Sequence, residues 1–507
     1  MSKKIALLLF FVVLKIVLQF SLVHPVYQLH RDEYLHIDQG RHLAAGYLSV
    51  PPLTGILSGL ILRMGNVDFW VRFFPALFGA LTIAIVWKSI MVLRGGIYAL
   101  VLGCSIVLLS ALLRLNILYQ PNSFDILAWT FIGYSVLMYL HSKKDKWIWI
   151  IFIAFALGFL NKYNVVFLMT GLVLSLMLTV ERKLFLKPKL YYAALLALLL
   201  VMPNLYWQFQ NGFPVVAHLR ELNDTQLVHV QRSDFIKEQL LFFAGGLPVL
   251  IAALISLIYY PPFKTYRVFI FLFFTTLGLF IFFKAKPYYA IGLYPIYFAF
   301  GAVWIEQKFK SHLQKWVLRP ILILLPIAFF ILVLNFAFPN KTPEAFVAQS
   351  RDKQNGFTHR WEDGNMHPIA QDFADMLGWK ELAAIVDSAY ETISNKNQTL
   401  IYCDNYGQAG AINYYSRHKS IQAISLNADY VNWIPENWQW QHCIRIKDRD
   451  DDSNEKRYFE KVLKAGKITN PFARELGTTV FILINANDSA KKIVNEEINA
   501  AKKRYRE

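Results

Sequence analysis

A pair of carboxylates follows the first apolar run of this chain. Asp32 and Glu33 stand near the start of the stretch His30–Leu53, just beyond the run that begins at Ile5. Charged groups beside hydrocarbon are costly, so an acidic pair there predicts function by default. Asp32 can act as a general base beside a membrane-embedded substrate, with Glu33 orienting a metal or an acceptor. Spacing alone equally allows a helix cap, and Arg31 can simply neutralise the pair.

A second group of reactive side chains combines cations with phenols. Lys284, Lys286, Tyr288 and Tyr289 come directly after an apolar run. Such a cluster can bind a phosphate, because lysine supplies a point charge and tyrosine a directed hydroxyl. Both residue types also favour the membrane interface as anchors, which is the alternative interpretation.

Weaker candidates lie between these two groups. Gly46-Tyr47 with Pro51-Pro52 indicates a sharp chain reversal, which makes Tyr47 a candidate substrate contact. Asp125 is expected about one turn into a helix, where it either caps the helix end or supports the acidic site. Lys162 beside Tyr163 is a further phosphate candidate.

The sequence leaves a metal undecided. Four histidines crowd the first long loop at a spacing of six, which matches no metal motif, although a histidine with Glu33 could ligate a divalent ion. No cofactor motif is certain, and no P-loop, dinucleotide fingerprint or nucleophile elbow is present. The four histidines are His24, His30, His36 and His42.

The elements that must position these residues are membrane helices. The chain has 507 residues, 55% of them hydrophobic and only 17% charged. Runs of about 20 apolar residues recur up to Phe338, each long enough to cross a bilayer. We expect about eleven spans: 4–23, 68–92, 96–115, 123–141, 147–161, 163–180, 190–207, 239–260, 267–283, 288–305 and 317–338. A broken helix or re-entrant pair is an alternative around residues 161–164.

Charge predicts the orientation of these spans. The net charge of +17 belongs to residues 1–338, because residues 339–507 carry 23 basic and 23 acidic side chains. Short basic loops alternate with long loops, and the basic ones are expected in the cytoplasm. The long first loop, 24–67, and the C-terminal region then lie outside. This explains the basic excess by topology, so we expect no nucleic-acid partner.

Composition changes after Pro339. Residues 371–394 have the pattern of an amphipathic helix, and 399–403 and 478–484 that of strands. We therefore expect a transmembrane domain over 1–338 and a small soluble α/β domain over 339–507. In the first loop, an amphipathic-looking piece at 34–45 and an apolar piece at 53–62 are expected along the membrane surface. A disulfide between Cys403 and Cys443 is an open alternative.

Several motifs together resemble a known family. Asp32-Glu33, Gly46-Tyr47 and Pro51-Pro52-Leu53 are similar to the first-loop signature of bacterial protein-mannosyltransferase-like membrane glycosyltransferases of family thirty-nine. Later motifs of that family resemble further stretches of this chain. These are Gln120-Pro121 with Ser123-Phe124-Asp125, Lys286 with Tyr288-Tyr289, Phe373–Trp379 and Asp404–Ala411.

The resemblance implies a GT-C fold and a sugar transfer with inversion. It implies a polyprenyl-phosphate sugar as donor and an envelope glycan, lipid or protein outside the cytoplasm as acceptor. Carried over, Asp32 is the base, Glu33 its neighbour, and Lys286 and Tyr288 bind the carrier phosphate with Tyr289 nearby. Ser49-Val50 departs from the polar or histidine residue of many relatives, which puts metal and sugar preference in doubt. The implied location is the bacterial inner membrane, with the N-terminus in the cytoplasm.

Two other classes of function compete with this one. A flippase or transporter of the lipid carrier should place its polar residues near mid-membrane, whereas here they gather on the outer loops. An envelope-assembly protein should expose apolar anchors on its C-terminal domain, for which Trp433, Trp438 and Trp440 are a hint.

Overall fold

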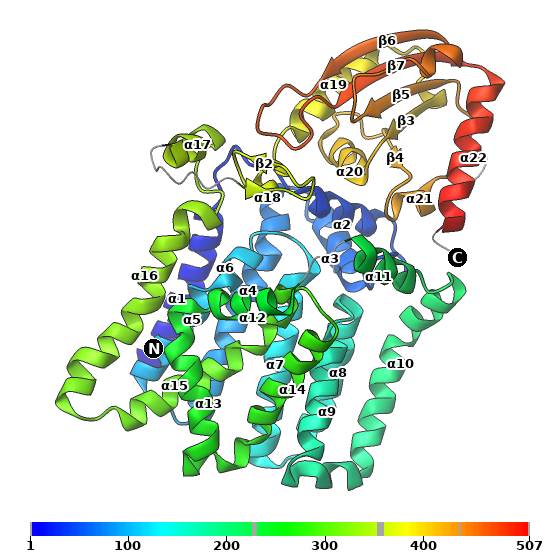
Figure 1. The fold of residues 1–507 in the computed structure, drawn as a ribbon. Coiled ribbons are helices and arrows are strands. Elements are labelled where there is room, and N and C mark those ends of the chain that lie inside the picture. The colour runs from blue at the N-terminus through cyan, green and yellow to red at the C-terminus, as the bar shows by residue number, and fades with distance from the viewer. Residues whose placement is uncertain (1–2, 226–230, 352–358, 436–437, 505–507) are drawn as a thin grey trace.

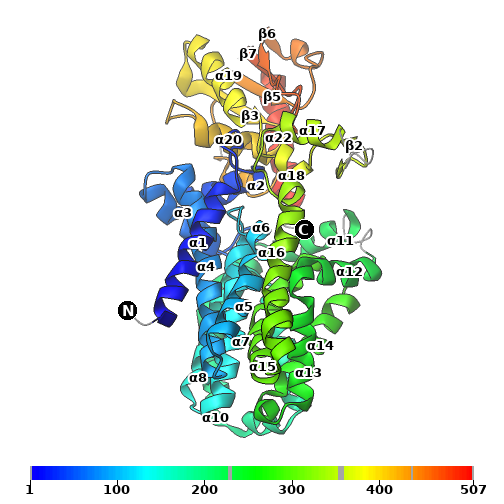
Figure 2. The same cartoon turned by 90° about the vertical axis from the view of Figure 1, so that its left-hand side faces the viewer.

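A bundle of apolar helices carries a sheet domain at one end (Figures 1 and 2). The computed structural model describes residues 3–225, 231–351, 359–435 and 438–504. The bundle contains α1 (Lys3–Ser21), α4 (Asp68–Val92), α5 (Ile97–Leu108), α6 (Ala111–Leu115), α7 (Pro121–Ser142), α8 (Lys146–Asn161), α9 (Val165–Met177), η1 (Val180–Leu186), α10 (Pro188–Gln210), α11 (Pro214–Thr225), α12 (Arg232–Phe242), α13 (Leu247–Tyr259), α14 (Val268–Phe282), η5 (Pro287–Leu293), α15 (Pro295–Lys308) and α16 (Arg319–Ala337).

Every expected span contains a helix. Within the described residues, five helices are long and apolar enough to cross a membrane, and the number rises to eight if each of three sharply bent pairs is one span. The three remaining spans correspond to the shorter apolar helices α5, α8 and α14. The run at 161–164 is interrupted, since α8 ends at Asn161 and α9 begins at Val165. The expected multi-pass helical membrane protein is confirmed.

The C-terminal domain is a mixed α/β structure, as expected. Its five-stranded sheet has the order β4-β3-β5-β7-β6. β4, β3 and β5 are parallel to one another, and β7 is antiparallel to both of its neighbours, β5 and β6. Its elements are α17 (Pro343–Arg351), β1 (His359–Arg360), β2 (Met366–His367), α18 (Gln371–Ala374), α19 (Trp379–Thr392), β3 (Thr399–Cys403), α20 (Tyr406–Tyr415), β4 (Ala423–Ser425), α21 (Tyr430–Trp433), β5 (His442–Lys447), β6 (Phe459–Lys467), β7 (Thr479–Ala486) and α22 (Asp488–Arg504).

Two sequence expectations for this domain need correction. The single helix expected over 371–394 is broken between α18 and α19, where Gly378 adopts φ 86°. A Cys403–Cys443 bridge does not form, because Cys443 is opposite Leu400 in the β3–β5 register, three residues from Cys403. Since an odd offset turns side chains to opposite sheet faces, the two thiols lie in different cores.

The first outer loop forms α2 (Arg31–Arg41) and α3 (Leu53–Arg63), which pack on each other. α3 exposes Ile56 and Leu60, as a helix on a membrane surface would. α2 is different: its residues from Glu33 to Gly40 are buried, because α3 covers one side and α20 the other. The expectation that this piece lies along the membrane surface is therefore wrong for α2.

Polar and close-packed contacts hold α2 against the C-terminal domain. Asp38 accepts hydrogen bonds from Tyr430 at 2.6 Å and Asn413 at 2.9 Å. A Cβ added to Gly410 of α20 would lie 2.6 Å from both the Tyr34 Cβ and the Tyr430 hydroxyl. The absence of a side chain at position 410 thus lets the two helices approach closely.

Candidate active site at the outer rim of the bundle

The start of α2 fixes the direction of both carboxylates. His30 is the N-cap residue, and its side chain accepts a hydrogen bond from the Asp32 backbone N–H at 3.2 Å. Glu33 closes a capping box by accepting from the His30 backbone N–H at 2.6 Å. The cap is therefore made by residues 30 and 33, which leaves the Asp32 side chain available for another role.

Glu33 is a structural acid in this geometry. Its second oxygen accepts from the backbone N–H of Tyr119 at 2.7 Å, and the residue is 1% exposed. Burial raises the pKa of Glu33, and the two backbone bonds oppose that shift. With both oxygens used in this way, Glu33 joins the outer loop to the segment before α7, so we assign it a positioning role.

Asp32 is the more accessible of the two acids. Its carboxylate accepts from the Tyr406 hydroxyl at 2.7 Å and from the Gln120 side-chain amide at 3.0 Å, and 36% of the side chain is exposed. Burial raises its pKa, but the neighbouring His30, the Tyr406 hydrogen bond and Arg31 together hold it below its usual value. Asp32 is therefore ionised at neutral pH and accessible from one side.

Arg31 connects Asp32 to the C-terminal domain. Its guanidinium lies 4.6 Å from the centre of the Tyr406 ring and 4.0 Å from the Asp375 carboxylate. Asp375 in turn lies 3.1 Å from Arg474. Arg31 thus holds the ring whose hydroxyl donates to Asp32, and we interpret it as a positioning residue. The carboxylate end of the site is defined as Arg31, Asp32, Gln120 and Tyr406.

Two lysines and two tyrosines form the other end. The Lys162 ammonium donates to the Asn122 side chain at 2.6 Å and lies 4.2 Å from the centre of the Tyr289 ring and 5.2 Å from that of Tyr288. Burial lowers the pKa of Lys162, the charge of Asp125 opposes this shift and that of Lys286 adds to it, and the resulting pKa is about 8. The cation end is defined as Lys162, Lys286, Tyr288 and Tyr289.

A chain of hydrogen bonds joins the two ends. Lys162 donates to Asn122 at 2.6 Å, Asn122 donates to Gln120 at 3.0 Å, and Gln120 donates to Asp32 at 3.0 Å. Burial lowers the pKa of Lys286, whereas the charges of Glu362 and Asp32 raise it. Lys286 is therefore within electrostatic range of Asp32. Two ammonium groups beside one another are costly to bury, which makes this end suited to an anionic group.

Asp125 lies just behind the cation end. It is 4% exposed and accepts a hydrogen bond from the Asn164 side chain at 2.9 Å. Its charge raises the pKa of Lys162. Asp125 therefore lies beside the cation end and stabilises the lysine charge, whereas the sequence suggested a helix cap or support of the acidic site.

Two candidates lie apart from this arrangement. Tyr47 is 2% exposed, and its hydroxyl donates to the Gln39 carbonyl at 2.7 Å, so it packs between α2 and α3. Lys284 is exposed, with a left-handed backbone of φ 51°, and forms none of the contacts that define the cation end. We therefore assign Tyr47 to loop packing and leave Lys284 at the periphery.

Sequence reasoning gave no role to Tyr406 or Gln120. Both belong to stretches that carried the family resemblance, which was the available signal.

Within the described part of the chain, no group of three or more His, Cys, Asp or Glu side chains is arranged to hold a metal ion.

Comparisons with known proteins agree with the resemblance. Residues 49–207 match the model of the dolichyl-phosphate-mannose-protein mannosyltransferase family. The fold is similar to ArnT from Cupriavidus metallidurans bound to undecaprenyl phosphate, with a TM-score of 0.63 and 14% identity over 94% of this chain and 98% of that one. Apo ArnT from the same organism gives a TM-score of 0.61 and 12% identity over 95% and 98%. No curated protein sequence matches significantly. The GT-C fold is confirmed.

Proposed function

We propose that this GT-C membrane protein is a glycosyltransferase that moves a sugar from a polyprenyl phosphate to an acceptor outside the cytoplasm. The family match over residues 49–207 and the ArnT-like fold support a glycosyltransferase, and they give no support to a flippase. The observation that carries the mechanism is the hydrogen-bonded chain that runs from Lys162 through Asn122 and Gln120 to the accessible Asp32 and so joins the cation end to the carboxylate end.

Asp32 is the general base in this proposal. The acceptor hydroxyl attacks the sugar carbon that bears the phosphate, and its proton passes to the Asp32 carboxylate. The carbon–oxygen bond to the phosphate breaks at the same time. Because the attack comes from the side opposite the leaving group, the product has inverted configuration. Tyr406 and Gln120 fix the carboxylate by the hydrogen bonds they donate.

The cation end receives the leaving group. The phosphate departs with the electron pair of the broken bond and so gains negative charge, which Lys286 and Lys162 stabilise. Tyr288 and Tyr289 line the same end, where their rings contact Lys162. Since the polyprenyl chain stays in the bilayer, its phosphate is held at the membrane interface, where these residues lie.

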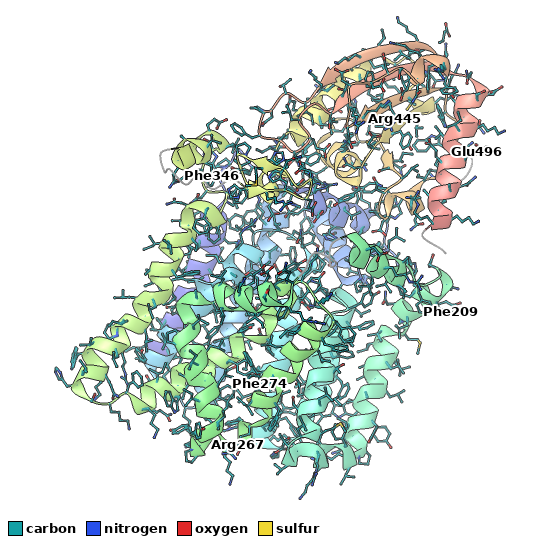
Figure 3. The ribbon with its side chains drawn as sticks, in the orientation of Figure 1. Phe209, Arg267, Phe274, Phe346, Arg445 and Glu496 are labelled. Carbon is teal, nitrogen blue, oxygen red and sulfur yellow. The ribbon has the colours of Figure 1, made fainter. Side chains whose placement is uncertain are left out.

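The orientation follows from the charge pattern. Figure 3 labels Arg267 at the end of the bundle away from the sheet domain and Arg445 within that domain. The basic loops gather at the Arg267 end, so the positive-inside rule supports a cytoplasmic location for it. We propose a bacterial inner membrane with the N-terminus inside, a transferase domain over 1–338 and an extracytoplasmic domain over 339–507. The acceptor is an envelope glycan, a lipid or a protein.

The test is a transfer assay with the full-length protein in vesicles. Polyprenyl-phosphate sugars labelled in the sugar are supplied, and label is followed into envelope glycan, lipid and protein fractions. Transfer is expected with the unaltered protein and absent with Asp32→Asn, while the matched exposed-loop variant Asp363→Asn remains active. Transfer at the unaltered rate with Asp32→Asn would remove the base assignment. Movement of intact labelled lipid across the vesicle membrane, without transfer, would instead favour a flippase.

A further inference from the structure

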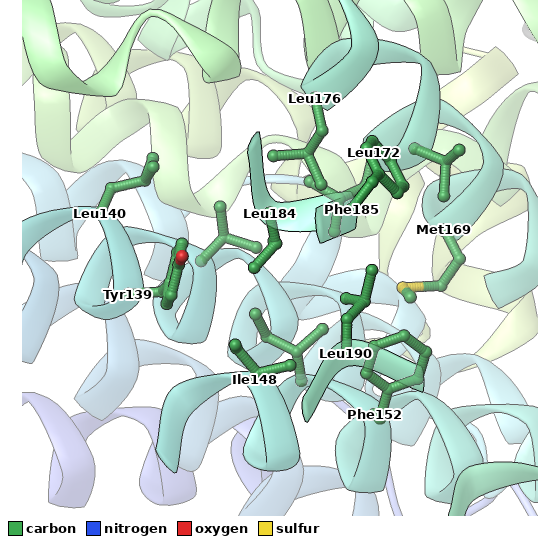
Figure 4. Close-up of a pocket in the computed structure, with 13 residues that line it drawn as sticks. Tyr139, Leu140, Ile148, Phe152, Met169, Leu172, Leu176, Leu184, Phe185 and Leu190 are labelled. Atoms are coloured by element: carbon green, nitrogen blue, oxygen red, sulfur yellow. The ribbon is translucent and has the colours of Figure 1, made fainter. Parts of the chain in front are cut away.

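An apolar pocket lies in the membrane bundle, away from the candidate active site. It has a cavity volume of about 70 Å³ and is bordered by α7, α8, α9, η1 and α10 (Figure 4). Of its thirteen lining residues, twelve are apolar and the thirteenth is Tyr139. Such a lining suits a hydrocarbon chain.

The pocket is at the opposite end of the bundle from Asp32. α7 begins at Pro121, beside the active site, and its pocket residues are near its other end, Ser142. From Asn122 to Tyr139 the helix rises by about 25 Å. α8 runs back from Lys146 to Asn161, and Ile148 and Ile151 of its first turns line the pocket.

Two basic segments meet at this end of the pocket. Residues 143–146 and 181–189 together carry seven Lys or Arg and two Asp or Glu. The segments are joined by ion pairs of Lys143 with Glu181 at 2.6 Å and of Lys187 and Lys189 with Asp145 at 2.8 and 2.9 Å. After both acids are paired, this rim still has an excess of positive charge, to which the exposed Arg182 and Lys183 contribute.

Tyr139 connects the apolar lining to the basic rim. The Lys143 ammonium is 5.6 Å and the Lys187 ammonium 5.7 Å from the centre of its ring. Pocket residues Leu184 and Phe185 belong to η1 itself, the element that carries Arg182 and Lys183. A molecule that fills the pocket therefore emerges among cations. η1 also exposes Val180 and Leu186, at 81% and 82%, as an element lying in the membrane interface does.

We propose that this pocket binds one acyl chain of an anionic glycerophospholipid of the cytoplasmic leaflet, with the lipid phosphate at the rim formed by residues 143–146 and 181–189. The apolar lining accepts the chain, and the excess of cations selects a negative head group over a zwitterionic one. The carrier lipid is a less suitable occupant, because its phosphate is assigned to the other end of the bundle. This site is separate from sugar transfer, but its assignment to the cytoplasmic leaflet and the choice against the carrier lipid rest on the proposed function.

The test uses the full-length protein in nanodiscs of equal phosphatidylcholine and phosphatidylglycerol, followed by native mass spectrometry of the released protein. The unaltered protein is expected to retain phosphatidylglycerol in preference to phosphatidylcholine. The double variant Arg182→Gln, Lys183→Gln should lower that preference about 25-fold, since each basic side chain near an anionic surface contributes about fivefold. Leu172→Trp should abolish retention, because the indole fills the pocket.

Matched variants make the outcome decisive. Lys310→Gln with Lys315→Gln removes the same charge from another basic loop, and Leu174→Trp adds the same ring to an exposed position of α9 outside the lining. Both should retain lipid as the unaltered protein does. Equal retention of the two lipids, or an unchanged preference in the rim variant, would overturn the proposal. Retention of a polyprenyl phosphate by protein extracted directly from cell membranes, in place of phosphatidylglycerol, would also overturn it. The rim variant alters only surface residues, so it decides the question even if Leu172→Trp fails to fold.

Discussion

The two ends of the candidate active site are built by different means. The carboxylate end depends on the C-terminal domain, because Tyr406 donates to Asp32 and stacks under Arg31. The cation end is built from the membrane bundle, where Asn122, Tyr288 and Tyr289 surround Lys162. In the proposed function, this difference divides the roles: the bundle holds the lipid-linked donor, and the C-terminal domain holds the base in position. Five variants or conditions test this division, beginning with the largest expected effect.

Replacement of the base should have the greatest effect. Asp32→Asn removes the proton acceptor but keeps the shape, so we expect kcat to fall by about a thousandfold or more. Expression and thermal stability should remain near those of the unaltered protein, since Asp32 makes no backbone bond through its side chain. Initial rates of sugar transfer measure this, with Asp363→Asn as the control. A fall of less than tenfold would contradict the assignment.

Replacement of Glu33 should lower stability, whereas replacement of Asp32 should lower activity. Both oxygens of Glu33 accept from backbone N–H groups, so Glu33→Gln places an amide N–H against one of these donors. This should lower the free energy of unfolding by about 2–3 kcal/mol. The thermal midpoint measured in detergent reports this loss. If Glu33→Gln were as stable as the unaltered protein but inactive, the structural assignment of Glu33 would be wrong and a catalytic one favoured.

Loss of a cation should reduce donor use in particular. Lys286→Ala removes a charge-assisted contact to phosphate, for which we expect a fall of about 10-fold to 100-fold in kcat/KM for the donor. The acceptor KM should change little. Lys237→Ala, an exposed lysine of α12, is the matched control. An equal fall in acceptor use would show that the two ends are not divided as proposed.

Removal of the Tyr406 hydroxyl should have a moderate effect with a distinct pH signature. One lost hydrogen bond predicts a fall of about 5-fold to 10-fold in kcat. The bond from Tyr406 lowers the pKa of Asp32, so its loss in Tyr406→Phe should raise that pKa and move the acidic limb of the pH–rate profile to higher pH. A purely structural role for Tyr406 would lower the rate without moving that limb.

The smallest expected effect is a shift at alkaline pH. Burial lowers the pKa of Lys162 to about 8, so its positive charge is present below this pH and is lost as the pH rises through it. We therefore expect kcat/KM for the donor to decline above about pH 8. Lys162→Arg keeps the cation and should move the decline to higher pH. An unchanged alkaline limb in that variant would assign the titration to another group.

Local patterns were sufficient to predict the membrane helices and the positions of the reactive side chains. Apolar runs identified each span, and the spacing of Asp32 and Lys286 between those runs placed both at one membrane face. The shape of α2 was harder to predict. Its burial depends on α20, more than 360 residues later in the chain, and no local pattern contains such a contact.

The adjacent acids show the same limit. Asp32 and Glu33 are nearly equivalent as sequence, and both a cap and a catalytic role were open for the pair. Their roles separate only through partners far along the chain, which are the Tyr119 backbone for Glu33 and the Tyr406 hydroxyl for Asp32. Tyr47 shows a different error. Its place in a turn made it a candidate substrate contact, but in the structure it packs between α2 and α3.

Gly410 has a consequence for any engineering of this enzyme. Gly407 lies three residues before it on α20. A Cβ added to Gly407 would lie 3.1 Å from the Arg31 Cβ, and one added to Gly410 would lie 2.6 Å from the Tyr34 Cβ. One methyl group at position 410 would therefore push the whole helix outward and carry the Tyr406 hydroxyl with it. Such a substitution contacts neither sugar nor phosphate. It would nevertheless slow the reaction, because the Tyr406 hydroxyl would no longer align the Asp32 carboxylate.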